Sequence, residues 1–203
     1  MFYEPKNPHG LRRNPFKSLV VPRPIGWISS VSRDGRVNLA PFSYFNAVAH
    51  LPPIVLFGCN GHHLEGGNKD TLDNVLETGE FVVNICTYEL REKMSATSEH
   101  LPRDVNEMAL AGLEPAPSRL VRPPRVAASP VNLECRVITS VKLPQTDPEE
   151  PNTTVFGEVI GIHISEDIIT DGMIDMTKFR PIARLGYHDY TVVDTVFTMR
   201  RPG

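Results

Sequence analysis

The stretch Ile25-Gly-Trp-Ile-Ser-Ser-Val-Ser32 decides the fold of this 203-residue chain. Its side chains alternate between two faces of an extended strand, with Trp27, Ser29 and Val31 on one face and Ile28, Ser30 and Ser32 on the other. The following residues, Arg33-Asp-Gly-Arg36, predict a tight turn, because Asp-Gly readily adopts positive φ. A returning strand over 37–39 then completes a β-hairpin.

Further short apolar runs extend this β pattern along the chain. Strands are expected over 54–57, 81–85, 131–143, 154–164 and 192–199, and short helices over 88–96, 104–111 and 176–178, the last capped by Asp175. The 19 prolines divide the chain into short elements. Residues 1–21 are expected to form an extended arm, and the proline-rich segment 113–130 an irregular connection. The pattern predicts roughly seven or eight strands with a few short flanking helices. This favours a mainly β barrel over a doubly wound sheet. A single domain is expected over 1–203.

Composition excludes several classes of protein. Lys+Arg 21 against Asp+Glu 24 gives a net charge of −3, which argues against a nucleic-acid partner. Apolar runs fall short of the roughly 20 residues that a membrane helix needs, and the N-terminus lacks the pattern of a secretory signal. Three cysteines without a CxxC pair predict neither disulfides nor zinc and fit a reducing cytoplasm.

The first candidate site is Arg23–Ser30 joined through the hairpin to Asn38–Asn46, a second stretch that ends in the polar and aromatic residues Ser43-Tyr-Phe-Asn46. Backbone groups here could bind the edge of a planar heteroaromatic ligand, with side-chain hydrogen bonds from Ser43 and Asn46. The alternative is a strand end whose serine and asparagine satisfy only the local backbone.

The second candidate site is Lys69-Asp-Thr71, which follows a glycine-rich loop over 60–68. Apolar residues at helical spacing predict a helix here, with Asp70 or Thr71 as the N-cap and Gly79 at the end. A helix N-terminus with a lysine and a hydroxyl group could hold a phosphate. The alternative is an ordinary capped surface helix.

Other kinds of catalytic site lack sequence support. There is no GxSxG, GxGxxG or GxxxxGK[ST] motif. Cys59, His62 and His63 have no fourth ligand at metal-like spacing, so no metal site is predicted. Without an obvious protein nucleophile, a cofactor that carries the chemistry suits this chain.

Taken in order, these motifs resemble the flavin reductase-like family, the FMN-binding split β-barrels of Greek-key type. The resemblance rests on Arg23–Ser30, Asn38–Asn46, Lys69–Thr71, Glu80–Asn84, Pro123–Val126, Ser129–Cys135 and Arg180–Gly186. It extends from about residue 14 to residue 200.

The resemblance implies a cytoplasmic homodimer with noncovalent FMN at or near the subunit interface. Carried over residue by residue, it implies a cofactor site formed by Trp27, Ser29, Ser30, Ser43, Tyr44, Phe45, Asn46, Lys69, Thr71 and Arg184. Lys69 and Thr71 would lie on the phosphate side, and Arg184 in a segment that closes over the flavin.

The implied activity is an NAD(P)H-dependent FMN reductase. NADH or NADPH would reduce the flavin, which would pass electrons to free flavin, oxygen or a partner protein such as a monooxygenase. One alternative is a noncatalytic, flavoredoxin-like electron carrier that nicotinamides do not reduce. A third is a relative of pyridoxamine-phosphate oxidase that uses the same barrel for another ligand.

Overall fold

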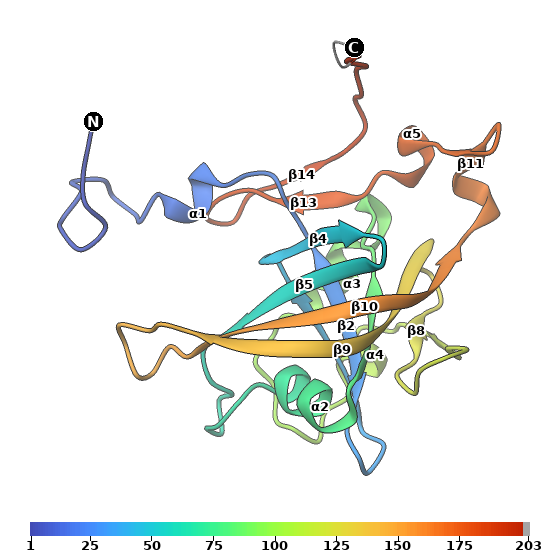
Figure 1. Ribbon diagram of the computed structural model, residues 1–203, viewed down its shortest axis with the longest axis horizontal. Coiled ribbons are helices and arrows are strands. Elements are labelled where there is room, and N and C mark those ends of the chain that lie inside the picture. The colour runs from blue at the N-terminus through green and yellow to red at the C-terminus, as the bar shows by residue number, and fades with distance from the viewer. Residues whose placement is uncertain (201–203) are drawn as a thin grey trace.

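The main feature of the computed structural model, which describes residues 1–200, is a curled antiparallel sheet of seven strands (Figure 1). In spatial order these are β3 (Val37–Phe42), β2 (Gly26–Val31), β6 (Glu80–Asn84), β9 (Val131–Leu143), β10 (Asn152–Ile164), β5 (Pro53–Asn60) and β4 (Phe45–His50). The two edge strands, β3 and β4, follow each other in the chain, yet no ladder joins them within residues 1–200. The mainly β prediction is confirmed.

The predicted hairpin is the pair β2–β3. Its register runs from Gly26 opposite Phe42 to Val31 opposite Val37. The returning strand is three residues longer than the expected 37–39, and it includes Pro41. A proline fits here because β3 is an edge strand, where one side of the backbone needs no partner.

Three smaller sheets surround the main one. They join β1 (Arg23–Pro24) to β13 (Ile182–Arg184) and β14 (Tyr190–Val192), β7 (Pro115–Ala116) to β8 (Arg125–Val126), and β11 (Ile169–Thr170) to β12 (Met173–Ile174). The segment expected to be irregular therefore contains one short strand pair, β7–β8. The strand expected over 192–199 is wrong: β14 ends at Val192, and Phe197 beyond it is 84% exposed, with no neighbouring strand to bury it.

The helices are short and lie around the sheet. They are α1 (Phe16–Leu19), α2 (Asp70–Thr78), α3 (Arg91–Ala96), α4 (Glu107–Leu110) and α5 (Met176–Phe179), with 3-10 turns at η1 (Tyr88–Leu90) and η2 (Glu166–Ile168). Asp175 caps α5 as predicted. The helix expected over 104–111 is shorter, because Asn106 caps it one residue before Glu107. None of the helices in residues 1–200 is long and apolar enough to cross a membrane.

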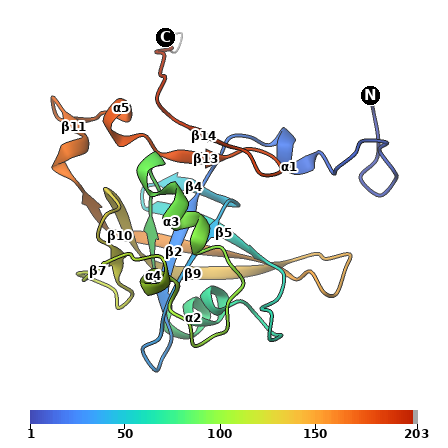
Figure 2. The ribbon, with the colours of Figure 1, turned by 180° about the vertical axis from the view of Figure 1, so that it is seen from behind.

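Both faces of β2 are buried, and each belongs to a separate core. Ile28 packs with Phe57, Phe81 and Val75 inside the curled sheet, where α2 covers one end. Trp27 packs with Met94 and other apolar side chains on the opposite face, under α3 and α4 (Figure 2). The alternation predicted for β2 is therefore confirmed, and the hairpin connects the two cores.

The three cysteines are unpaired and buried, which for Cys86 and Cys135 agrees with their place in apolar runs of the sequence. Burial raises the pKa of Cys59 to about 11 and that of Cys86 to about 12. Both thiols are therefore protonated at neutral pH and poor nucleophiles.

Candidate functional site

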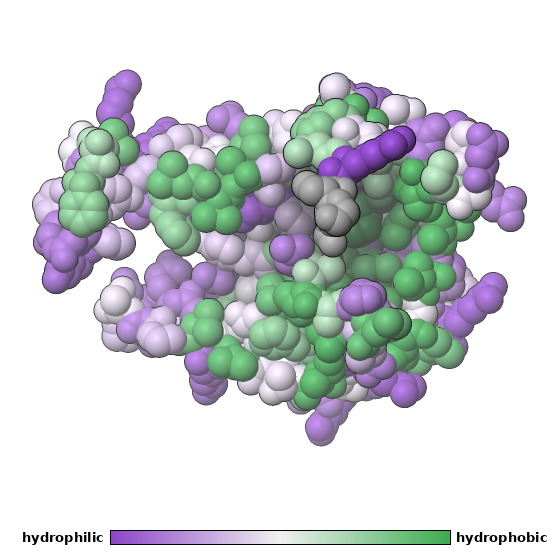
Figure 3. All heavy atoms as spheres, turned by 45° about the horizontal axis from the view of Figure 1, so that its top comes forward, coloured by the Kyte–Doolittle hydropathy of each residue, from purple (hydrophilic) through white to green (hydrophobic). Residues whose placement is uncertain are grey.

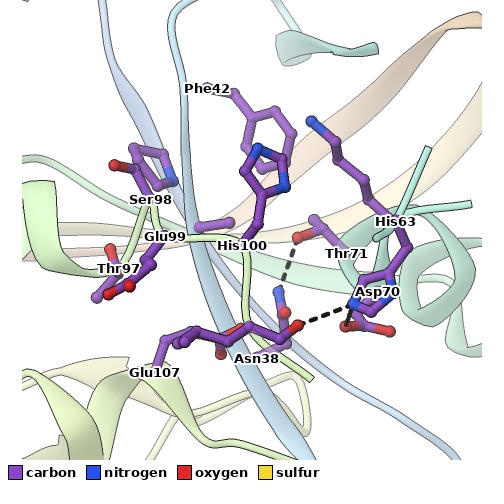
Figure 4. Close-up of a pocket in the computed structure, with 14 residues that line it drawn as sticks. Asn38, Phe42, His63, Asp70, Thr71, Thr97, Ser98, Glu99, His100 and Glu107 are labelled. Atoms are coloured by element: carbon purple, nitrogen blue, oxygen red, sulfur yellow. Dashed lines mark hydrogen bonds and ion pairs between the residues drawn. The ribbon is translucent and has the colours of Figure 1, made fainter. Parts of the chain in front are cut away.

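A cavity of about 120 Å³ lies where β3, the start of α2 and the segment after α3 meet. Figure 4 shows Thr97–His100 on one side of it and His63, Asp70 and Thr71 on the other, with Asn38 and Glu107 below. Lys69 also lines the cavity. The structure thus brings two of the predicted site residues, Lys69 and Thr71, to one place.

The N-terminus of α2 opens onto this cavity. Lys69 is the N-cap, with extended φ −66 and ψ 147, and its carbonyl accepts hydrogen bonds from Leu72 N and Asp73 N. The prediction of Asp70 or Thr71 as N-cap is wrong, because Arg103 binds the Asp70 carboxylate and Asn38 binds the Thr71 hydroxyl. The first N–H groups of a helix have no acceptor within it, so this end attracts an anion. Gly79 ends the helix at φ 72, as predicted.

A buried polar network forms the floor of the cavity. Thr71 is 1% exposed, and its Oγ1 lies 2.7 Å from the Asn38 amide. With its nitrogen toward Thr71, the amide donates to the hydroxyl; turned over, it accepts the Thr71 proton and donates to Glu107 Oε1 at 3.2 Å. Only the turned-over orientation gives both ends of the amide a suitable partner, and in it the Thr71 hydroxyl proton is donated to Asn38.

Glu107 lies at the base of this network. Its Oε2 accepts a hydrogen bond from Leu39 N at 3.1 Å, and its side chain is buried. Burial raises the pKa of Glu107 above its ordinary value, although hydrogen bonds from backbone N–H groups act in the opposite direction.

The glycine-rich loop before α2 is held against the cavity wall by two basic side chains. His63 Nε2 lies 3.1 Å from the carbonyl oxygen of Leu101 and 3.5 Å from the Asp70 carboxylate. Arg103 binds Asp70 and donates to the carbonyl oxygens of Gly66 and Asn68 at 2.8 and 3.0 Å. These contacts fix the backbone that leads into Lys69.

The predicted residues of β2 lie beneath the site and not at its surface. Trp27, Ser29 and Ser30 are all 0% exposed. Trp27 Nε1 donates to Thr97 Oγ1 at 2.9 Å, Ser29 donates to Pro124 O at 2.5 Å, and Ser30 accepts from Asn74 at 3.0 Å. Trp27 thereby supports Thr97, which lines the cavity. Cofactor contact by these three residues stays a prediction.

Ser43 and Tyr44 join the edge strands β3 and β4, and Phe45 and Asn46 are the first two residues of β4. Ser43 and Tyr44 are half-buried, Phe45 is buried, and Asn46 is exposed, with its side chain accepting from Ala47 N at 2.9 Å. The backbone of this segment pairs with β5: Gly58 N donates to Tyr44 O at 2.7 Å, and Phe45 lies opposite Phe57 in the ladder. Ring contacts by these four residues also stay a prediction.

Arg184 lies on β13, in the smaller sheet, and does not line the cavity. Its guanidinium donates to Tyr190 Oη and to the carbonyl oxygen of Tyr187, and its Cζ lies 4.4 Å from the centre of the Tyr190 ring. These contacts hold together the turn that links β13 to β14. A role for Arg184 in closing over a flavin stays a prediction.

The comparison with family models decides the classification of this chain. Residues 18–189 match the model described as "Flavin reductase like domain". The chain belongs to this family.

Individual relatives support this family membership. An uncharacterized protein of Aquifex aeolicus is 41% identical over 169 residues, 83% of each chain. Nitrilotriacetate monooxygenase component B from Bacillus cereus is 30% identical, covers 98% of each chain and superposes with a TM-score of 0.85. A Shewanella frigidimarina protein described as a flavin reductase with a split barrel domain is 21% identical over 92% of this chain and 90% of its own, with a TM-score of 0.80. This member of the flavin reductase-like family therefore has the split-barrel fold.

Sequence patterns did not identify three residues that line the cavity in this family member, His63, His100 and Glu107. His63 was considered only as a metal ligand, whereas its ring binds Leu101 O and Asp70. His100 and Glu107 come from a segment about 30 residues beyond Lys69. No local pattern indicates that this segment returns to the start of α2.

Proposed function

We propose that this chain is an FMN-binding oxidoreductase of the flavin reductase type, reduced by NADH or NADPH. Its electrons would pass to free flavin, oxygen or a partner protein such as a monooxygenase. The observation that carries the proposal is the convergence of Lys69, Thr71 and the α2 N-terminus on one cavity, which edge strand β3 also lines.

The cavity suits the phosphate end of FMN and is too small for its ring. The cavity, at about 120 Å³, has room for a phosphate group and a few more atoms but not for a tricyclic ring. Lys69 and the first N–H groups of α2, including that of Thr71, would therefore hold the phosphate. The ring would lie outside the cavity, along Ser43–Asn46, the segment that follows the cavity-lining residues Ala40, Pro41 and Phe42.

FMN, when bound, supplies the redox chemistry by accepting two electrons as hydride from a nicotinamide. The chain's own residues would bind FMN and orient it. Lys69 neutralises phosphate charge, and Asn38 and Glu107 set the direction of the Thr71 hydroxyl. His63 and Arg103 hold the loop that positions Lys69. No protein acid or base is required for a hydride step.

Absorbance spectroscopy tests this function. The purified protein, reconstituted with FMN and freed of excess, is expected to be yellow, and anaerobic NADH or NADPH is expected to bleach it within seconds. A protein that retains no FMN would refute the cofactor. Bleaching by dithionite but by neither nicotinamide would favour an electron carrier, and a different chromophore would point to another ligand of the barrel.

We also propose that the chain acts as a homodimer in a reducing compartment, the cytoplasm. All three cysteines are unpaired, which agrees with such a compartment. Edge strand β4 supports the dimer, since five consecutive residues from Asn46 to His50 are exposed on it. A partner protein could then receive electrons at the open side of the sheet; Bacillus cereus component B is by its name part of such a monooxygenase system.

A further inference from the structure

A second polar cavity lies at the far end of β9 and β10, against the proline-rich connection. It measures about 380 Å³ and shares no residue with the Lys69 cavity. Arg119, Arg125 and His163 line it, together with Ser129, Asn132 and Ser165. Its volume falls within the range of small-molecule sites and exceeds what a bare ion needs.

Two guanidinium groups give this cavity its charge. Arg125 is fixed in place, because its Nε donates to Pro117 O and its Nη1 to Asn132 Oδ1, both at 3.1 Å. Within residues 1–200 no carboxylate oxygen lies within 4.0 Å of the guanidinium nitrogens of Arg119 or Arg125. The remaining N–H groups of Arg125 and those of Arg119 are therefore available to an acceptor.

The buried carboxylate beneath the cavity is turned inward. Glu134 on β9 is 0% exposed, and it accepts hydrogen bonds from Arg119 N at 2.8 Å and Leu120 N at 2.6 Å. Its Oε1 also lies 2.5 Å from His163 Nε2 on β10. Because a carboxylate only accepts, Nε2 carries a proton and the ring is held in one orientation.

This arrangement anchors the backbone beneath Arg119. Glu134 is buried and accepts hydrogen bonds from three donors of the protein, so its oxygens are not available to either guanidinium group, and its single negative charge offsets at most one of the two positive charges. Asp167, whose carboxylate accepts from Ser165 Oγ at 3.2 Å, lies exposed at the rim. The interior of the cavity thus presents fixed donors and positive charge.

We propose that this cavity binds the oxyanion group of a small molecule, a phosphate or a carboxylate. Planar guanidinium groups match both groups through paired N–H donors. Ser129 Oγ donates to Ile85 O and Val131 O at 2.9 Å and Asn132 Nδ2 donates to Asn84, so the floor is rigid. The site requires neither FMN nor the proposed redox function.

Calorimetric titration with two probes, inorganic phosphate and citrate, tests the proposal. The starting protein carries Lys69→Ala, which removes the lysine of the other cavity. We expect saturable binding of at least one probe. The double variant R119A/R125A should weaken this binding about tenfold or more, because it removes both charged donor groups. Arg136→Ala is the matched control: Arg136 is an exposed arginine of β9 outside the cavity, and its removal should leave affinity unchanged.

The relative affinities identify the ligand class. Tighter phosphate binding would indicate a phosphorylated ligand, and tighter citrate binding a carboxylic acid. R119K/R125K keeps the charges and loses the paired geometry, so binding intermediate between wild type and R119A/R125A also supports the site; thermal melts verify that each variant folds. Absent binding, equal affinity in R119A/R125A, or weak binding that chloride abolishes in every variant (an adventitious ion only) would overturn the proposal.

Discussion

Lys69 is the residue on which the proposed phosphate site depends most. We expect Lys69→Ala to weaken FMN binding by about 1.5–3 kcal/mol, the usual cost of losing a charge-assisted hydrogen bond. Riboflavin, which lacks the phosphate, should bind both proteins equally. Fluorescence titration of both flavins measures this. The control is Lys142→Ala, at an exposed position of β9 away from the cavity, which should bind FMN as the wild type does. If Lys69→Ala weakened FMN and riboflavin equally, Lys69 would not contact the phosphate.

Glu107 predicts a pH dependence of stability. Burial raises the pKa of its carboxyl in the folded state above the ordinary value of 4.5, so the folded protein holds this proton more tightly than the unfolded chain. The contribution of Glu107 to the free energy of unfolding is therefore largest below the ordinary pKa and is lost as pH rises through the raised one. Urea titrations from pH 4 to 7 should show wild type losing stability relative to Glu107→Gln. A difference between the two that is constant with pH would show that Glu107 titrates normally.

For individual residues, the sequence predicted those site residues that belong to one local pattern. Lys69 and Thr71 stand at a helix start, and the physics of a helix N-terminus needs no knowledge of the rest of the fold. Glu107 and His63 join the same cavity only through contacts with β3 and the segment after α3. Such contacts depend on tertiary packing, and they produce no regular spacing of residues in the sequence from which they could be predicted. For the same reason the burial of Ser29 and Ser30 was not foreseen: both faces of β2 are covered.

Among the elements, strands with a continuous apolar run were the predictable ones, whereas β4, whose residues from Asn46 to His50 are exposed, is absent from the expected strands although it pairs with the next strand in the chain. The β2–β3 pair has its turn in Asp34-Gly35, and β9 (Val131–Leu143) matches its expected bounds. The strand expected over 192–199 failed, since hydrophobic alternation indicates a strand only if a neighbour is there to pair with it. The very short strands β7 and β8 carry no pattern long enough to detect.

Strand β10 offers a prediction about packing between elements. A Cβ on Gly157 would lie 2.4 Å from Phe81 Cζ, and Phe81 on β6 is 0% exposed in the inner core. Gly157→Ala should therefore lower the free energy of unfolding by about 1–3 kcal/mol, the usual cost of overpacking. Chemical denaturation measures the loss.

Gly161→Ala, on the same strand, is the control for this substitution. Its Cβ would meet the exposed Leu120 side chain, which can move aside, at 3.3 Å, and the buried Glu134 Cβ at 3.4 Å, an ordinary van der Waals distance. We expect a clearly smaller loss of stability than for Gly157→Ala. Equal losses in the two variants would mean that strand propensity, and not the contact with Phe81, limits residue 157.

The molecule as a whole exposes much apolar surface. Hydrophobic side chains gather in several groups on the face shown in Figure 3. The exposed large side chains include Phe16 at 58%, Leu19 at 70% and Leu51 at 84%. Monomeric proteins rarely leave large contiguous patches of this kind uncovered. The unpaired edge of β4, with Val48 49% exposed, adds a strand edge that proteins usually cover.

A second copy of the chain is the proposed cover, and light scattering after gel filtration tests it. We expect a mass about twice 22.6 kDa at micromolar concentration. V48D/L51D places two charges beside the β4 edge, where desolvating them in an interface is costly, so the double variant should elute as a monomer. Leu64→Asp, an equally apolar replacement site that is 53% exposed on the loop before α2, should remain a dimer. A wild-type monomer would refute the homodimer, whereas a dimer that survives V48D/L51D would move its interface away from β4. If the open side of the sheet is also where the flavin ring lies, the monomeric variant should lose FMN affinity while its Lys69 cavity stays intact.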